Sequence, residues 1–428
     1  MVEISSWGRL TRASHVVIDL NDRFAVARCL EGKLPGLAYG SGRSYGDVCL
    51  NPAGTLWMTR GLDRFIEFDI RSGRILCEAG VLLKDIQRLV NRHGWRLPVV
   101  PGTQFVTVGG AIANDIHGKN HHRYGTFGEH VLRLSVARTD GALAECHPGE
   151  ALFAATVGGL GLTGVIVEAE IQLAPLSSAW LTVESIPYAS LTEFFELADQ
   201  SESDWENTVA WIDCFDSMGR GIFSRAKPAP ADEGRAPSNR SLGIRVQPPV
   251  SLVNALSVRL FNRIYHYVHK SRGVCVQHQD AFHHPLDHVR DWNLMYGPQG
   301  FYQYQCVVPR QGAQEAVRSM LAATRKAGSG SFLAVLKTFS DRPAVGMLSF
   351  PMPGVTLALD FPNAGEKTLK LLTELDAIVE DFGGRLYMAK DARMPAALFR
   401  SGYPRLAEFL PHRDPGISSS MSRRLMDS

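Results

Sequence analysis

Residues 101–130, PGTQFVTVGGAIANDIHGKNHHRYGTFGEH, constrain this chain more than any other segment. An apolar stretch that contains Gly109 and Gly110 leads directly into a loop dense in polar side chains. Glycines carry no Cβ, so paired glycines let the backbone approach a ligand closely. Histidine, lysine and amide groups beside them suit a site that holds an anionic cofactor and moves protons. The segment alone leaves one alternative open, a buried strand followed by a solvated His-rich loop.

Two further segments are rich in glycine. Residues 39–47, YGSGRSYGD, predict a turn whose consecutive N–H groups can bind phosphate oxygens, with Arg43 adding positive charge. Residues 156–164, TVGGLGLTG, match the G-x-G-x-x-G dinucleotide fingerprint. That fingerprint requires a helix after the glycines, whereas residues 165–173, VIVEAEIQL, alternate as a strand does. We therefore predict a tight turn feeding a strand, and no nicotinamide site.

Together these segments resemble the FAD-binding oxidoreductases of the vanillyl-alcohol-oxidase type, and within them the polyprenylphosphoryl-ribose 2′-oxidases. The matching blocks span nearly the whole chain in family order. They are GSGRSYGD at 40–47, PGT..VTVGGAIA.DIHGKNHH at 101–122, ATVGG.GLTG at 155–164, YGP.GF.QYQ at 296–305 and GGRLY.AKD.R at 383–393. The DIHGKNHH string is the most specific of them.

The resemblance implies an α+β fold with two domains. An FAD-binding domain is expected over 1–178, a substrate domain of antiparallel sheet covered by helices over 179–382, and a C-terminal segment, 383–428, that returns to the FAD domain. Helices are predicted over 81–93 and 314–326, and strands over 74–78, 132–137, 301–308 and 356–360, from their apolar periodicity.

The implied reaction is FAD-dependent oxidation of the 2′-hydroxyl of a polyprenyl-phosphoryl-β-D-ribofuranose to the 2′-keto sugar. This is the first half of epimerisation to the arabinose donor of the cell envelope, and a separate NAD(P)H-dependent keto-reductase would complete it. An FAD-dependent oxidase of a free sugar, alditol or aldonolactone is the alternative. A non-enzymatic scaffold that docks the reductase is a third reading, which the retained histidine and lysines disfavour.

Length and composition agree with such an enzyme. A chain of 428 residues predicts two or three domains, and a net charge of +2 gives no sign of nucleic-acid binding. Seven cysteines without a C-x-x-C predict neither a disulfide framework nor a metal site. No run of about eighteen apolar residues and no signal peptide are found. We expect a cytoplasmic protein, with peripheral contact to the inner membrane left open.

Three side chains are expected to carry the chemistry. His117 suits proton transfer near neutrality, either as the base or as an orienting group. Lys390 is implied by the resemblance to lie near substrate, where it would stabilise charge or bind phosphate; the alternative is a solvated lysine paired with Asp391. Lys337 interrupts an apolar run, FLAVLKTF, so on a strand it would point into a cavity or meet a carboxylate. His121 is a secondary candidate.

The resemblance also implies two sets of binding positions. Those expected to bind substrate are Tyr45, Lys119, Asn120, Tyr296, Gln303, Gln305 and Ala358. Those expected to bind FAD are Gly40, Ser41, Gly42, Arg43, Ser44, Tyr45, Gly46, Gly102, Thr103, Thr107, Gly109, Gly110, Ala113, Asn114, Ile116, His117, Gly159, Gly161, Gly164, Val165 and Tyr387.

Two departures from the family pattern are informative. Mycobacterial members carry a cysteine where this chain has Ala358, so covalent chemistry at that thiol is absent while the function is retained. Related oxidases tether FAD through a histidine in the first glycine loop, and residues 40–47 contain none. FAD is therefore expected to be non-covalent.

Residues 226–250 are rich in Pro, Ala, Gly and charge, which predicts a flexible loop. Residues 251–270 predict a helix, on which Leu252, Leu256, Leu260, Ile264 and Val268 share one face and the remainder is basic. Such a helix can lie on an anionic membrane. The alternative is an ordinary helix docked on its own domain.

Overall fold

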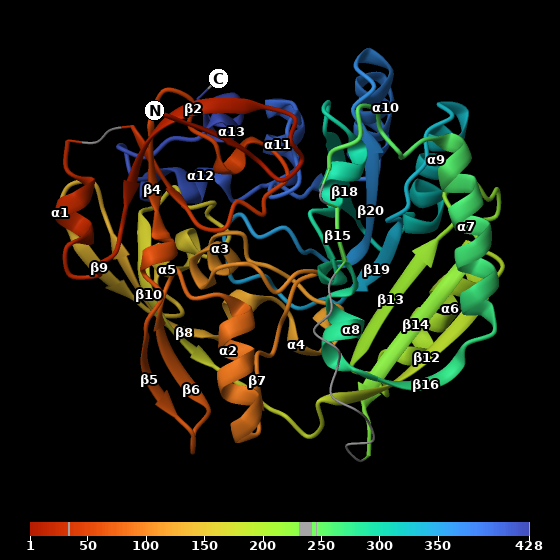
Figure 1. Ribbon diagram of the computed structural model, residues 1–428, viewed down its shortest axis with the longest axis horizontal. Coiled ribbons are helices and arrows are strands. Elements are labelled where there is room, and N and C mark those ends of the chain that lie inside the picture. Colours follow the sequence, from red (N-terminus) through yellow and green to blue (C-terminus); the bar gives the residue numbers. More distant parts are fainter. Residues whose placement is uncertain (33–34, 231–241, 245, 428) are drawn as a thin grey trace.

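The computed structural model describes residues 1–32, 35–230, 242–244 and 246–427 (Figure 1). Two sheets form the first part of the fold, on the left of Figure 1. One has the order β1 (Val2–Ser5), β2 (Arg12–Asp19), β4 (Thr55–Met58), β3 (Gly36–Tyr39). The other is antiparallel, in the order β5 (Phe65–Asp69), β6 (Arg74–Glu78), β10 (Val165–Gln172), β8 (Val131–Ala137), β9 (Leu143–Cys146).

Short helices cover this part. The first glycine segment continues from β3, the helix α2 (Leu83–Val90) follows β6, and α3 (Val108–Ala113) packs against β10. The turn at 156–164 leaves α5 (Ala151–Thr156) and enters β10, as predicted. Gly161 there has φ +73°, a conformation that glycine adopts without strain.

An eight-stranded antiparallel sheet forms the second part, on the right of Figure 1. Its order is β16 (Gly273–His278), β12 (Trp180–Tyr188), β14 (Gly221–Pro228), β13 (Asn207–Ile212), β19 (Val335–Phe339), β20 (Gly354–Pro362), β18 (Phe301–Val308), β21 (Arg385–Leu386). Helices α6 (Leu191–Ser201), α9 (Ala313–Lys326) and α10 (Glu366–Asp381) pack against it. The α+β fold and the antiparallel sheet covered by helices are confirmed.

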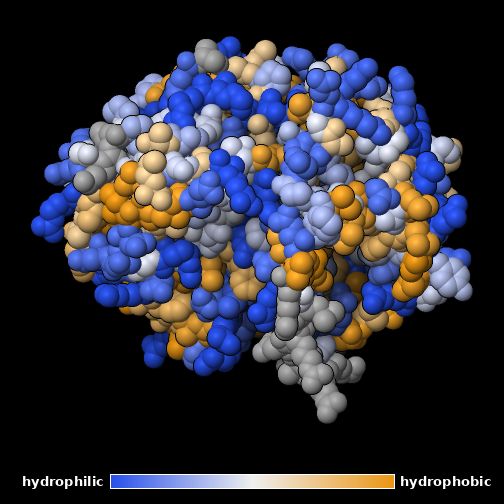
Figure 2. Space-filling view, turned by 45° about the horizontal axis from the view of Figure 1, so that its top comes forward, coloured by the Kyte–Doolittle hydropathy of each residue, from blue (hydrophilic) through white to orange (hydrophobic). Residues whose placement is uncertain are grey.

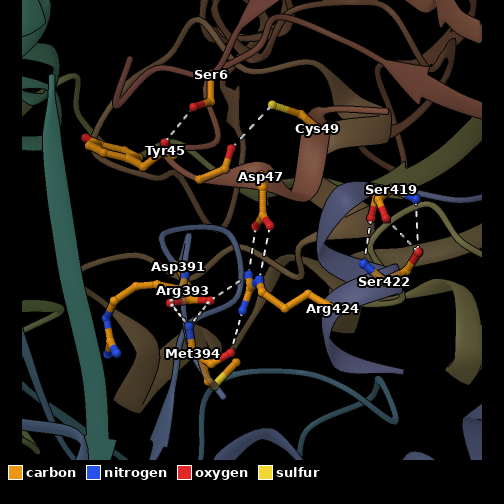
Figure 3. Close-up of polar contacts among 11 residues, drawn as sticks. Ser6, Tyr45, Asp47, Cys49, Asp391, Arg393, Met394, Ser419, Ser422 and Arg424 are labelled. Atoms are coloured by element: carbon orange, nitrogen blue, oxygen red, sulfur yellow. Dashed lines mark hydrogen bonds and ion pairs between the residues drawn. The ribbon is translucent and has the colours of Figure 1, made fainter. Parts of the chain in front are cut away.

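The last residues of the chain cross back to the first part. After β21 come α11 (Ala396–Gly402), α12 (Leu406–Phe409) and α13 (Ser420–Leu425). Ile417 bridges Gly36 of β3, and the Ser420 amide donates to the Leu50 carbonyl at 2.7 Å. Arg424 of α13 donates to Asp47 at 2.8 Å and to Asp391 at 3.0 Å (Figure 3). One guanidinium thus joins the first glycine loop to the turn that carries Lys390.

Most predicted elements are confirmed within one or two residues, but one expectation and one open alternative are wrong. Gly109 and Gly110 lie on the helix α3 and not on a strand, because the Thr107 side chain accepts from the Gly110 amide and caps a helical turn there. The flexible loop predicted from residue 226 begins too early, since β14 extends to Pro228 and pairs with β12. Residues 231–241 and 245 of that loop lie outside the described residues.

The predicted helix over 251–270 is present as α7 (Ala255–Lys270), capped by Asn254. It packs against β12 and β14, but not through the face that its apolar periodicity suggested. Val258 and Asn262 are the buried side chains, whereas Leu256, Leu260, Ile264 and Val268 face solvent.

We expect Arg424→Ala to destabilise the protein. Asp47 and Asp391 would keep their buried positions without the guanidinium, and burial already raises the pKa of Asp47. Loss of one partner of such a network costs about 3 kcal/mol of unfolding free energy. Arg405→Ala is the control, because its pair with Glu408 is exposed and contributes at most about 1 kcal/mol. Equal urea midpoints for the two variants would contradict the role given to Arg424.

Candidate active site

A cavity of about 1350 Å³ lies where the two parts of the fold meet. Its walls include the first glycine loop, the segment from Val100 to Lys119, and the strands β13, β18, β19 and β20. A single drug-sized ligand occupies roughly 300–1,000 Å³. The cavity therefore has room for a dinucleotide and a second molecule beside it.

The residues present fit an FAD. Backbone is open to the cavity at Gly102 and Gly161, where an added Cβ would meet nothing within 4 Å. Arg43 Nε, Asn114 Oδ1 and His117 Nδ1 are buried and have no hydrogen-bond partner among the described residues. Buried polar atoms are normally satisfied, so these three are expected to bond a ligand. The loop Gly40–Arg43 and the segment 102–114 would hold the cofactor.

Close backbone approaches shape the first glycine loop. The Tyr45 amide donates to the Ala389 carbonyl at 3.0 Å, and a Cβ on Gly46 would lie 1.5 Å from the Asp391 carbonyl oxygen. Gly42 has φ +59°. Arg43 stacks over the Trp7 ring at 4.2 Å, which holds its charge at the cavity wall.

His117 lies in an aromatic enclosure at the cavity. Its ring contacts Phe339, Phe350 and Tyr387, with centroids 5.0 to 5.5 Å away. The Gln305 amide nitrogen lies 3.2 Å from Nε2, so with that amide donating, the imidazole proton sits on Nδ1. Burial, reinforced by the nearby Lys337, places the pKa of His117 well below its usual value. The ring is therefore neutral at pH 7.

The turn before His117 is held by a buried carboxylate. Asp115 has φ +37°, accepts the Gly128 amide at 2.9 Å and accepts the Ser349 hydroxyl at 2.5 Å. Burial raises its pKa to about 6. Tyr387 adds a second clamp, because its hydroxyl donates to the Asn114 carbonyl at 2.9 Å. These bonds fix the direction in which the His117 ring points.

Three lysines converge on the same cavity. Burial lowers the pKa of Lys390 to about 7, of Lys119 to about 7 and of Lys337 to about 8. Lys390 lies 3.8 Å above the Tyr45 ring, and Lys337 donates to the Gly118 carbonyl at 3.2 Å. Lys119 donates to the Phe282 carbonyl. Burying three ammonium groups together is costly, and an anionic ligand among them would offset that cost.

Asp360 is the carboxylate whose charge acts on Lys390. It is fully buried on β20, accepts from the Gln303 amide at 2.6 Å and lies 3.4 Å from the Tyr296 hydroxyl. Burial raises the pKa of Asp360 to about 7, and its charge in turn favours the ammonium form of Lys390. Both groups therefore titrate near neutrality. Lys390 does not pair with Asp391, which bonds Arg424 instead.

The strands of the large sheet bring their polar and small side chains to one side of the cavity. Gln303 and Gln305 of β18, Lys337 of β19, and Thr356 and Ala358 of β20 all line it. A second stretch is apolar and lies next to α7, with Trp211, Phe261 and Phe332 in the wall. The cavity thus offers a polar end for a sugar phosphate and an apolar end beyond it.

Five expected site residues do not line the cavity. Gly46 and Gly159 meet neighbouring backbone at 1.5 and 2.0 Å from an added Cβ, so they serve close packing. Asn120 donates to the Pro98 carbonyl at 2.8 Å. Tyr296 stacks on Phe301 and approaches Asp360, and Val165 is buried at the start of β10. His121, the secondary candidate, also lies outside the wall, with its ring 4.5 Å from that of Phe339, whereas the remaining expected positions are brought together in the wall.

Several cavity residues were not anticipated. His283, His284 and Asp287 line it from the segment around α8 (Gln279–His283), and Trp7 lines it from the N-terminus. Burial lowers the pKa of His284 to about 3. The doublet HH at 283–284, followed three residues later by Asp287, was the available signal. Asp360 was missed because a single acidic residue near the end of an apolar strand such as LALDF is common and gives no specific signal.

Comparison with known proteins agrees with this geometry. A family model described as FAD binding domain matches residues 23–147. The chain is 35% identical to decaprenylphosphoryl-β-D-ribose oxidase of Mycolicibacterium smegmatis, over 99% of this chain and 97% of that protein. The chain belongs to this family of FAD-dependent oxidoreductases. An uncharacterized protein of Streptomyces coelicolor is 32% identical over 81% of this chain and all of its own length.

More distant relatives match only a part of the chain. D-lactate dehydrogenase of Archaeoglobus fulgidus is 33% identical, but over 30% of each chain. The similarity to the ribose oxidase therefore extends over the eight-stranded sheet, whereas the similarity to the dehydrogenase is local. Among the described helices, none is long and apolar enough to cross a membrane.

We expect Asp360→Asn to shift the pH midpoint of flavin reduction downward. The Asp360 charge raises the pKa of Lys390, so removing it lowers that pKa from about 7. The direction is the same whether the ammonium or the amine is the active form, because the midpoint follows the Lys390 pKa in both cases. Rapid-mixing rates between pH 5 and 9 measure it.

Asp280→Asn is the control for this shift. Asp280 lines the cavity but is not among the charges that act on Lys390. Its variant should keep the parental midpoint. A parental midpoint in Asp360→Asn as well would show that Lys390 does not govern the titration.

Proposed function

We propose that this protein oxidises the 2′-hydroxyl of a polyprenyl-phosphoryl-β-D-ribofuranose to the 2′-keto sugar. The product would be the intermediate of epimerisation to an arabinose donor. A separate NAD(P)H-dependent keto-reductase would reduce it from the other face. The observation that carries this proposal is the similarity to decaprenylphosphoryl-β-D-ribose oxidase along 99% of the chain.

The cavity supports a substrate with an anionic sugar and an apolar tail. Lys119, Lys337 and Lys390 supply positive charge, Gln303 and Gln305 supply amides suited to sugar hydroxyls, and Phe261 and Phe332 supply the apolar end. A free sugar or alditol would leave both the lysine cluster and the aromatic end without partners. An oxidase of such soluble substrates remains the alternative outcome of the test.

The chain's own residues position the alcohol and move its proton. FAD, when bound, supplies the acceptor for the two electrons released. Lys390 is proposed to take the hydroxyl proton, because a pKa of about 7 leaves part of the amine free at neutrality. His117 is proposed to orient the ligand by donating from Nδ1, since Gln305 occupies Nε2. Lys337 is proposed to hold the substrate phosphate.

Further features are proposed with this function. The three divisions 1–178, 179–382 and 383–428 are proposed as FAD-binding domain, substrate domain and returning segment, supported by the contacts of α13 with the first glycine loop. A polyprenyl chain stays in a bilayer, so the protein is proposed to work as a peripheral protein at the membrane that holds its substrate.

Anaerobic mixing with polyprenyl-phosphoryl ribose tests the function. We expect the flavin absorbance to bleach with this substrate and not with free ribose, alditols or aldonolactones. Bleaching by the soluble compounds alone would favour the alternative oxidase. No bleaching by any of them would end the proposal that the chain is a sugar oxidase.

The same assay tests the chemical residues. His117→Ala and Lys390→Ala should each lower the rate of flavin reduction by about 10²- to 10⁴-fold, as expected for loss of a proton-transfer or orienting group. Bound FAD, measured by absorbance per chain, should fall far less. Parental rates in both variants would remove these residues from the chemical step.

We propose that FAD is held without a covalent bond and expect denaturation with acid to release it. Residues 40–47 contain no histidine that could tether the ring. Burial raises the pKa of Cys49, the nearby thiol in the cavity wall, to about 12, so that thiol is a poor nucleophile. Flavin that stays with the precipitated chain would show a covalent link.

A further inference from the structure

The helix α7 exposes an apolar row to solvent. Leu256, Leu260, Ile264 and Val268 are 78%, 59%, 54% and 48% exposed. At 100° per residue they lie on the side opposite Val258, the side chain through which α7 packs on its sheet. Figure 2 shows apolar side chains gathered in a column on the right, where α7 lies in Figure 1.

The exposed row is part of a larger apolar surface. Leu252 before the helix and Tyr267 on it are also exposed. More than half of the large exposed apolar side chains of the described residues fall between 246 and 276. Contiguous apolar surface of this kind marks a place where another apolar phase is contacted.

Positive charge borders this surface. Arg259, Arg263 and Lys270 occupy one flank of α7, beside the apolar row, and Arg272 follows the helix. Residues 242–279 contain no aspartate or glutamate. Apolar side chains bordered by cations without acids fit the surface of an anionic bilayer. A docked protein would more often be met by charges of both signs.

The apolar surface is continuous with the cavity. Phe261 of α7 is 37% exposed and also lines the cavity, and its ring lies 4.9 Å from that of Phe332, which lines it too. Tyr265 continues inward, 4.7 Å from Trp211. An apolar path thus leads from the outer face of α7 around the helix to the apolar end of the cavity.

We propose that α7 forms the surface by which this protein rests on an anionic bilayer. The apolar row of α7 enters the headgroup region, and Arg259, Arg263 and Lys270 contact anionic headgroups. The opening of the cavity at Phe261 then faces the bilayer, so a lipid-linked sugar enters the site while its chain runs along Phe261 and Phe332. The second part of this statement rests on the proposed function; the docking does not.

Sedimentation of the holoenzyme with vesicles tests the docking without any turnover. Vesicles of phosphatidylcholine with phosphatidylglycerol should bind the parental protein at low salt, and more weakly at high salt or without the anionic lipid. Leu256→Gln/Leu260→Gln should weaken binding by about tenfold or more, because two apolar side chains no longer enter the bilayer. Arg259→Glu/Arg263→Glu should abolish the preference for anionic lipid.

Phe24→Gln/Leu143→Gln is the control, since these side chains are 80% and 60% exposed, on the other part of the fold. It should bind as the parental protein does. An equal loss of vesicle binding in Leu256→Gln/Leu260→Gln and in the control would overturn the proposal. Parental binding by Leu256→Gln/Leu260→Gln would also overturn it. The proposal would also be overturned if the parental protein bound no vesicles, or if light scattering showed that it self-associates through this surface.

Turnover separates the docking from the proposed function. Leu256→Gln/Leu260→Gln should oxidise vesicle-held substrate at least several-fold more slowly and a short, water-soluble prenyl analogue at the parental rate. A further outcome is that the parental protein binds vesicles and this variant loses that binding, while neither protein oxidises either substrate. That result would support the docking and rule out the proposed function. Equal losses on both substrates would make α7 structural and overturn the proposal.

Discussion

The approach of two backbones, at Gly46 and at Asp391, organises the site. They lie so close that no side chain fits on Gly46, and Arg424 neutralises the acidic groups on both sides. The contact joins residues more than 340 positions apart in the sequence. The contact places the ring of Tyr45, from the first glycine loop, beneath Lys390. Lys390 lies in the turn that follows β21. The cofactor loop and the proton-transfer group are therefore held as one unit.

The lysines show how burial alone prepares the site. None of Lys119, Lys337 and Lys390 forms an ion pair among the described residues, and the low-dielectric wall pushes each pKa toward neutrality. The site is consequently poised to take up an anion together with protons. His117 stays neutral for the same reason and contributes direction, not charge. The charge of Asp360 opposes this shift, because it raises the pKa of Lys390 and so favours its ammonium form.

Sequence patterns predicted the elements well where periodicity is strong. The alternation YQYQ in β18 placed both glutamines on one face, and the isolated lysine of β19 pointed to a cavity. Periodicity failed on α7, because it finds an apolar face but not whether that face meets the core or solvent. The buried-strand alternative at Gly109 and Gly110 is wrong for another reason, because a side-chain cap there outweighs the low helix propensity of glycine. The role of Asp360 lies in its effect on the pKa of Lys390, thirty residues away, and no local sequence pattern reveals that effect.

The return of the chain also has a consequence for biosynthesis. Arg424 completes the first glycine loop, and Ser420 hydrogen-bonds Leu50 beside it. A nascent chain that has just completed its first two β-sheets still lacks these contacts. The loop can reach its final shape only after nearly all of the protein has left the ribosome. Cofactor capture is thereby timed to follow translation, and a prematurely terminated chain would leave Asp47 without its guanidinium.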